Sequence, residues 1–204
     1  MKSIVGRITI ISMLFVLLLS GAWASSSPIP MLQNTADQVI SVLKAHKNQL
    51  KNNPNISYNA VVHYVVPVVD QQAMAQAVVG RNAWGKATSA QRTEFIKEFR
   101  ILVTRTYASA FSEFSNERVV FQPIRGSVNQ SMLQVQSKII SNVRPSVDLN
   151  YTLVNHGAGW KITDFSVDGI SMIQSFRSQF LSTLAQSGMS GLIQELASHN
   201  KKLS

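Results

Sequence analysis

The sequence contains no cysteine, and only 14% of its 204 residues are charged. The absence of cysteine excludes a disulfide scaffold, a thiolate zinc site and a cysteine-nucleophile enzyme. Only one apolar run reaches even half of the roughly 20 residues that span a bilayer, which excludes a transporter with several membrane spans. Because 45% of the residues are hydrophobic, a disordered tail is excluded as well. A compact basic domain with enough apolar residues for one core remains.

The N-terminal segment has the three parts of a secretory signal. Two basic residues precede an apolar stretch from Ile8 to Leu19, and small residues follow up to Ala24. We therefore expect residues 1–24 to be a signal peptide cleaved after Ala24, with residues 25–204 forming a single mature domain. The alternative, an uncleaved anchor, is less favoured because the stretch is short and ends in a cleavage site. An exported protein without cysteine folds without oxidation, which suits a bacterial periplasm.

The charge is strongly positive. The sequence has 19 basic and 10 acidic residues, and removal of Lys2 and Arg7 with the signal leaves 17 basic residues and a net charge of +7. A solvated basic surface, nucleic-acid binding and attraction to anionic lipid headgroups could each use this charge. Export and the scattering of the basic residues argue against nucleic acid. Near an anionic membrane each Lys or Arg is worth on the order of 1 kcal/mol.

Helical spacing of apolar residues dominates the first half of the mature chain. One helix contains the apolar residues from Val39 to Leu50, and a second is expected from about Ser57 to Val66. Asp70 is placed to cap a third helix that ends at Gly80.

The clearest local signal begins a long helix. Thr88 followed by Gln91 forms a capping box, and the apolar stripe after it predicts an amphipathic helix to about Phe114.

The period changes to two after Asn116. Apolar and polar residues alternate at 133–139 and at 147–153, and Trp160 begins a further strand. Such alternation is typical of antiparallel strands with one buried face. A helix follows Asp168-Gly169 and is broken at Ser187-Gly188. The predicted fold is α+β, with a curved antiparallel sheet of about four strands and helices packed on one face. Periodicity alone allows either a solid core or a cone with an apolar cavity between its layers.

Catalytic motifs are not found in the sequence. None of the four histidines has metal-ligand spacing to another histidine or to a carboxylate, and nucleophile-elbow, phosphate-loop and dinucleotide motifs are absent. We expect no catalytic residue, no metal and no cofactor. Three carboxylates have expected structural roles: Asp70 caps a helix, Asp168 belongs to a turn, and Asp164 breaks the strand alternation and is expected to pair with an arginine.

Three stretches together resemble the toluene-tolerance, or MlaC, family of periplasmic phospholipid-binding proteins. They are residues 66–81, with Val66-Pro67-Val68-Val69-Asp70, residues 84–108, with Trp84-Gly85-Lys86, and residues 159–180, with Gly159-Trp160-Lys161. They occur in the family's order and cover nearly the whole mature chain. The sequence departs from the family at Asp168, where Glu is common, and at Asn82-Ala83, which lengthens one interval.

The resemblance implies a carrier that shuttles phospholipid between an outer-membrane lipoprotein–porin complex and an inner-membrane ATP-driven transporter, maintaining outer-membrane lipid asymmetry. It implies a monomer whose only bound molecule is its lipid cargo, held in a cavity between sheet and helices. Residue period and the family's architecture give the expected lining of that cavity: Val65, Val69, Met74, Val78, Phe99, Val103, Tyr107, Phe111, Val135, Ile139, Leu149, Tyr151, Leu153, Met172, Phe176 and Phe180.

Two other functions stay open from the residues. A cone-shaped α+β fold can hold a carboxylate general base in an apolar pocket, so an isomerase-like or hydratase-like enzyme using Asp70 or Asp164 is the main alternative. The other is a docking module whose apolar face is covered by a partner chain.

Overall fold

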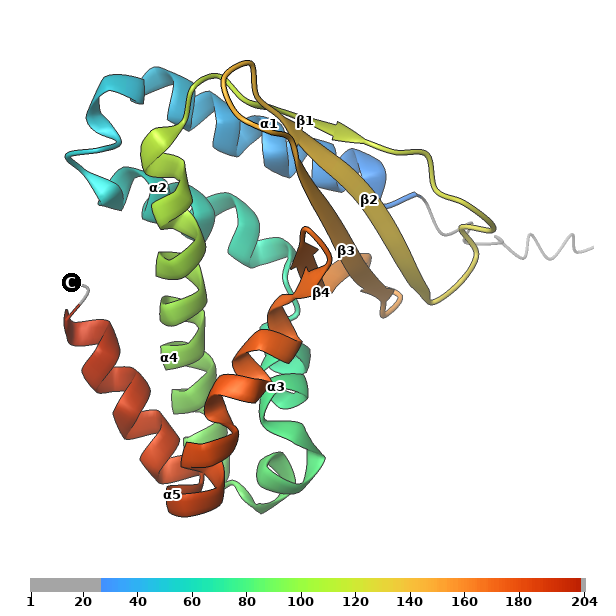
Figure 1. Ribbon diagram of the computed structural model, residues 1–204. Coiled ribbons are helices and arrows are strands. Elements are labelled where there is room, and N and C mark those ends of the chain that lie inside the picture. Colours follow the sequence, from blue (N-terminus) through green and yellow to red (C-terminus); the bar gives the residue numbers. More distant parts are fainter. Residues whose placement is uncertain (1–26, 203–204) are drawn as a thin grey trace, which may run out of the picture.

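The computed structural model describes residues 27–202 (Figure 1). The expected signal peptide and its cleavage site lie outside the described residues. Within residues 27–202, no helix is long and apolar enough to cross a membrane.

The chain begins with helices that pack beside and beneath the sheet. They are α1 (Ile29–Ala45), the turn η1 (Lys47–Gln49), α2 (Pro54–Ala60), the π-helical turn η2 (Val61–Val65) and the 3-10 turn η3 (Val66–Val68). Pro54 occupies the first turn of α2, where its missing N–H costs nothing. The predicted helix from Ser57 to Val66 is therefore a short α-helix that widens into a π-turn.

Two longer helices follow, α3 (Gln71–Lys86) and α4 (Ser89–Ala108). The Asp70 carboxylate accepts from the backbone N–H of Ala73 at 2.8 Å, which confirms the predicted cap. The reciprocal bonds of the capping box at Thr88 and Gln91 are also present.

The first of these helices is interrupted where predicted, and the second ends earlier than predicted. The helical conformation that begins at Gln71 is interrupted at Gly80, as predicted, because its φ of +80° is not helical, and a second helical stretch within α3 continues to Lys86. The regular part of α4 ends at Ala108, and the 3-10 segment η4 (Ser109–Glu113) carries the chain onward. Apolar spacing cannot distinguish a kinked or tightened helix from a straight one, because both keep apolar residues on the inner side.

The sheet is antiparallel, curved and unclosed (Figure 1). Its strands are β1 (Arg118–Phe121), β2 (Met132–Ile140), β3 (Val147–Asn155), β4 (Trp160–Val167) and β5 (Ile170–Ser171), paired in chain order. The prediction of about four strands missed only β5, which has two residues. The pairing of β3 with β4 shifts register between Thr152 and Leu153, so Leu153 faces Ile162 while Thr152 faces Asp164. This bulge explains the broken alternation near Asp164.

α5 (Met172–Lys202) leaves the sheet and reverses direction at Gly188, which has φ +63°. The predicted break at Ser187-Gly188 is thus confirmed. Its two halves pack against α3 and α4 in the lower part of Figure 1.

The apolar interior is divided into three clusters. The helical core joins α3, α4 and α5 and includes Met74, Val78, Phe95, Phe99, Leu102, Met172, Phe176, Phe180 and Leu192. The sheet core joins α1 to the sheet through Leu32, Leu133, Val135, Leu153, Trp160 and Ile162. The corner core consists of Val39, Leu43, Leu50 and Phe114. Val69 packs against the first two clusters, and its neighbour Asp70 donates its N–H to the Ile162 carbonyl at 2.9 Å, which fixes α3 to β4.

Candidate functional site

The helix-facing side of the sheet is covered at one end and open at the other. Val135 and Leu153 are 1% and 0% exposed beneath Leu32 of α1. Toward the other end of the sheet, two cross-strand residue pairs are only half-buried: Ile139 opposite Val147, and Leu149 opposite Val167. These four side chains belong to none of the three clusters formed by the described residues.

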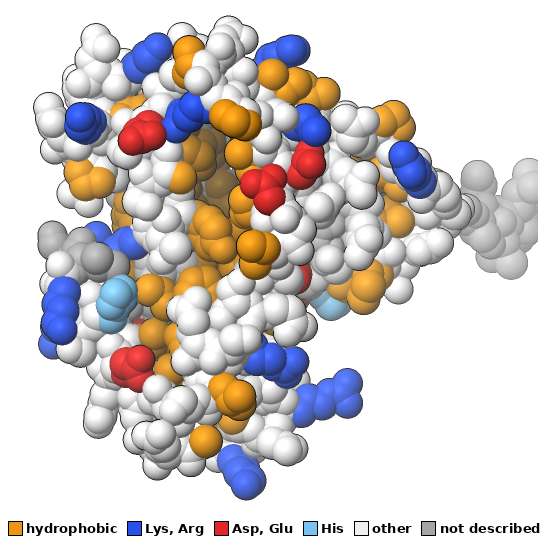
Figure 2. Space-filling model, viewed as in Figure 1, with side chains coloured by type: hydrophobic (Ala, Val, Ile, Leu, Met, Phe, Trp, Pro, Cys, Tyr) orange, Lys and Arg blue, Asp and Glu red, His pale blue; other side chains and the backbone are white. Residues whose placement is uncertain are grey.

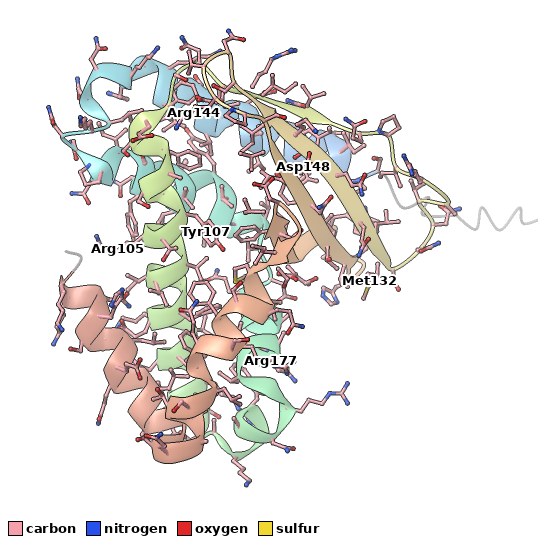
Figure 3. The ribbon with its side chains drawn as sticks, viewed as in Figure 1. Arg105, Tyr107, Met132, Arg144, Asp148 and Arg177 are labelled. Atoms are coloured by element: carbon pink, nitrogen blue, oxygen red, sulfur yellow. The ribbon has the colours of Figure 1, made fainter. Side chains whose placement is uncertain are left out.

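The helices supply the opposite wall. Val103, Tyr107 and Phe111 are four residues apart along α4 and η4, which places them on one side of that segment. All three are half-buried, and Tyr107 points from α4 toward the sheet (Figure 3). Figure 2 shows a hollow lined by hydrophobic side chains between the helices and the sheet. We call this space the hollow, and from strand register, helical spacing and partial burial we assign these residues to its walls: Val103, Tyr107, Phe111, Ile139, Val147, Leu149 and Val167.

Charged side chains lie near the upper end of the hollow. Arg144, in the β2–β3 hairpin, contacts Glu113 at 3.1 Å and Glu117 at 2.8 Å (Figure 3). Lys138 and Asp148 form a further ion pair at 3.0 Å across β2 and β3. The hairpin is thus tied by charge to the segment that follows α4.

The acidity of Glu117 follows from its partners. Burial alone would raise the pKa of this carboxyl, but the N–H and hydroxyl of Ser115 and the guanidinium of Arg144 stabilise its charged form. Together they lower the pKa of Glu117 to about 2. Glu117 therefore stays ionised and paired with Arg144 across the physiological pH range.

Two tyrosine hydroxyls belong to the apolar walls. Burial raises the pKa of Tyr151, against a hydrogen bond from Ser137 that lowers it. Burial and the negative charge of Asp164 raise the pKa of Tyr107. Both phenols therefore remain protonated and neutral at ordinary pH.

The structure separates the sixteen predicted lining residues into two sets. Half-buried positions with a side chain still accessible are Val65, Val69, Val103, Tyr107, Phe111, Ile139, Leu149 and Tyr151. Closed positions within the helical core or the sheet core are Met74, Val78, Phe99, Val135, Leu153, Met172, Phe176 and Phe180. Of the first set, Val65 packs against the corner core, Val69 against the helical and sheet cores, and Tyr151 against the sheet core. The second set is buried within the helical core and the sheet core.

Sequence reasoning missed several residues of the walls. Val147 and Val167 lie on the open part of the sheet, and Phe165 on β4 pairs with Tyr151. Phe121 lies on β1, beyond β2, with its ring 6.1 Å from that of Tyr151. Their alternation with polar neighbours was a usable signal for the inner face of the sheet. Nothing local indicated which part of that face stays uncovered.

The three carboxylates have structural partners. Asp164 accepts from the Ser171 hydroxyl at 2.7 Å and from the N–H of Ile173 at 3.3 Å, so the expected pairing with an arginine was wrong. The register shift between β3 and β4 places Asp164 beside the start of α5. Asp168, with φ +48°, is the turn residue predicted, and its carboxylate accepts from the N–H of Asp148.

Asp70 has a second partner that the sequence did not indicate. Its carboxylate lies 3.2 Å from Nε2 of His156, in the β3–β4 turn, and forms an ion pair when that histidine is protonated. His156 is 58% exposed, so the pair lies at the surface. Among residues 27–202 no group of three or more His, Asp or Glu side chains could hold a metal ion.

A separate open groove of about 760 Å³ lies between α1 and the α2–η2 segment. His46, His63 and Tyr64 are among its lining residues. None of the sixteen predicted residues lines this groove.

Two relatives with known names are similar to this chain in sequence. The chain is 29% identical over 165 residues to toluene tolerance protein ttg2D of Pseudomonas putida, covering 81% of this chain and 76% of the relative. It is 26% identical over 179 residues to the intermembrane phospholipid transport system binding protein MlaC of Haemophilus influenzae, covering 86% and 83%.

A solved structure has the same architecture. The phospholipid-binding protein of Ralstonia solanacearum, determined in complex with a phospholipid, superposes with a TM-score of 0.79 at 26% identity. The match covers 87% of this chain and 99% of that one. The sequence profile of the MlaC protein family matches residues 33–198, from α1 to the last turns of α5. The chain therefore belongs to the MlaC protein family.

Proposed function

We propose that this protein is a periplasmic phospholipid carrier that holds acyl chains in the hollow and performs no chemistry. The single observation that carries the proposal is the uncovered apolar wall at Ile139, Val147, Leu149 and Val167, opposite Val103, Tyr107 and Phe111. Each methylene that leaves water for such a wall contributes roughly 0.8 kcal/mol. Two acyl chains would therefore bind tightly without any contact to a headgroup.

The relatives support the same ligand class. One is named for intermembrane phospholipid transport, and the Ralstonia structure contains a phospholipid. In the proposed cycle the protein moves lipid between an outer-membrane lipoprotein–porin complex and an inner-membrane ATP-driven transporter, which would maintain outer-membrane lipid asymmetry. It would do so as a monomer with no cofactor, after export and removal of residues 1–24.

The positive charge fits this role. A net charge of +7 for residues 25–204 favours the approach to anionic membrane surfaces and to acidic docking partners.

An enzyme with a carboxylate base has less support. Asp70 caps α3 and contacts His156, and Asp164 bonds to Ser171 and to the N–H of Ile173. A general base must instead present an available oxygen to its substrate.

The test is native mass spectrometry of the protein purified from cells, before and after incubation with phospholipid vesicles. We expect a monomer carrying the mass of a phospholipid, and exchange of that lipid for a labelled one supplied in vesicles. Folded protein that carries no lipid and takes none from vesicles would refute the proposal.

A further inference from the structure

Tyr151 is a polar residue at the edge of the hollow, because it is two residues from Leu149 on the same face of β3 and pairs with Phe165, whose ring contacts that of Tyr107. It lies on β3, the middle strand of the sheet, and shares the helix-facing side with Val135 and Leu153. Because β2 and β4 flank it, the part of this half-buried side chain that is still exposed opens toward the helices. Its ring lies 6.1 Å from that of Phe121, so the phenol lies along the sheet, over β2.

The hydroxyl of Tyr151 has a donor available. Ser137, 3% exposed on β2, donates its hydroxyl proton to the Tyr151 oxygen at 3.4 Å. Among the described residues, Ser137 is the hydrogen-bond partner of the Tyr151 hydroxyl. With its oxygen accepting from Ser137, the O–H of Tyr151 can donate to a ligand.

The surroundings make this donor selective. It lies among apolar side chains, where an unmade hydrogen bond is costly, and burial keeps the phenol protonated. A ligand that suits this donor has a hydrogen-bond acceptor that carries no proton, and apolar chains beside that acceptor that can pack along the apolar wall. An acyl ester carbonyl meets both conditions, whereas a charged phosphate would keep its hydration outside the hollow.

We infer that Tyr151 is a specificity-determining residue, whose hydroxyl, oriented by Ser137, donates a hydrogen bond to an ester carbonyl of the bound glycerolipid. This inference rests on the proposed lipid-carrier function. It goes further by selecting ester-linked over ether-linked chains at one named atom.

The experiment compares two phosphatidylglycerols with the same chain lengths, one with ester linkages and one with ether linkages. Vesicles containing equal amounts of both are incubated with protein stripped of lipid, and native mass spectrometry gives the ratio of the two bound lipids. We expect wild-type protein to prefer the ester lipid by about five-fold, as one net hydrogen bond allows. Tyr151→Phe keeps the ring and should bring the ratio close to one, with ether-lipid binding retained.

Two further variants isolate the hydroxyl. Tyr64→Phe removes a phenol hydroxyl from the separate groove beside α1 and should keep the wild-type ratio. Ser137→Ala removes the orienting donor and should lower the ratio toward that of Tyr151→Phe. Melting temperatures establish that each variant is folded.

The outcomes separate the two proposals. A wild-type protein that binds both lipids equally, or a Tyr151→Phe variant that keeps the preference, would overturn the role of Tyr151 and leave the carrier function intact. Failure of the wild-type protein to bind either lipid would overturn the carrier function and this inference together.

Discussion

The ring of Tyr107 on α4 meets the ring of Phe165 on β4 edge-on, with centroids 4.8 Å apart and planes inclined by 70°. Both side chains also pack against the helical core. The contact therefore joins the helix layer to the sheet at the boundary between two environments. On one side is the closed packing of α3, α4 and α5, and on the other is the hollow.

Filling the hollow should separate lipid binding from stability. Leu149→Trp enlarges a half-buried side chain that faces the hollow, so we expect less than about 1 kcal/mol of destabilisation and loss of lipid uptake. Val135→Trp enlarges a side chain that is 1% exposed in the sheet core, and overpacking should cost about 1–3 kcal/mol. Urea unfolding and vesicle exchange, measured on both variants, check this contrast. Equal destabilisation by the two substitutions would mean that the space beside Leu149 is already filled.

The same pair of residues shows what the sequence could predict. Alternation correctly placed Val135 and Leu149 on the inner face, because side chains two apart along a strand share a face. It could not distinguish them, because the burial of Val135 depends on Leu32, more than a hundred residues earlier in the chain. The burial of the other closed residues in the predicted lining likewise depends on contacts that are distant in the sequence.

Local chemistry was predicted well, and distant polar contacts were not. The caps at Asp70 and Thr88 use partners three residues away, so a sequence motif contains all that the contact needs. Arg144 contacts Glu113 and Glu117 across 31 and 27 residues, and no spacing rule points to that pairing. The misassignment of Asp164 arose because a bulge changes strand register without a signal in the sequence.

A backbone conformation at the kink of α3 should limit substitution there. Gly80 has φ +80°, and a Cβ at this position would lie 3.2 Å from the guanidinium of Arg177, which is labelled in Figure 3. Gly80→Ala should therefore destabilise the fold by roughly 1–2 kcal/mol. Gly85→Ala is the matched control, since its Cβ would meet nothing within 4 Å and alanine favours helix by about 1 kcal/mol. Thermal melting of both variants should give shifts of opposite sign, and a stabilising Gly80→Ala would contradict the argument.

Stability should depend on Glu117 in acid. Its pKa is about 2 in the folded protein against an ordinary value of 4.5, so its contribution is complete above pH 4.5. That contribution is lost as the pH falls from about 4.5 to about 2, because the unfolded chain binds the proton first. The side chain is 12% exposed, and after allowance for screening we expect Glu117→Gln to cost about 1–2 kcal/mol at pH 7.

The acid dependence has its own control. Glu113, the other carboxylate beside Arg144, is 76% exposed, and Glu113→Gln should change stability by less than about 0.5 kcal/mol. Urea unfolding from pH 2 to pH 7 should show a shallower acid slope for Glu117→Gln alone. If wild-type protein and this variant have the same slope between pH 4.5 and 2, Glu117 does not have the lowered pKa.

The end of α5 should depend on one buried polar contact. Asn200 is 5% exposed and donates from Nδ2 to the Glu98 carboxylate at 2.7 Å and to the Glu98 carbonyl at 3.0 Å. Asn200→Ala would deprive a buried carboxylate of a donor, at a cost of about 1–3 kcal/mol. Because the contact lies at the end of the chain, the loss should appear first as local opening.

Hydrogen exchange should accelerate in the second half of α5 and remain unchanged in its first half. His199→Ala alters the exposed neighbouring residue and should leave both halves protected. Uniformly faster exchange along α5 in Asn200→Ala would show that the contact supports the whole helix and not its end.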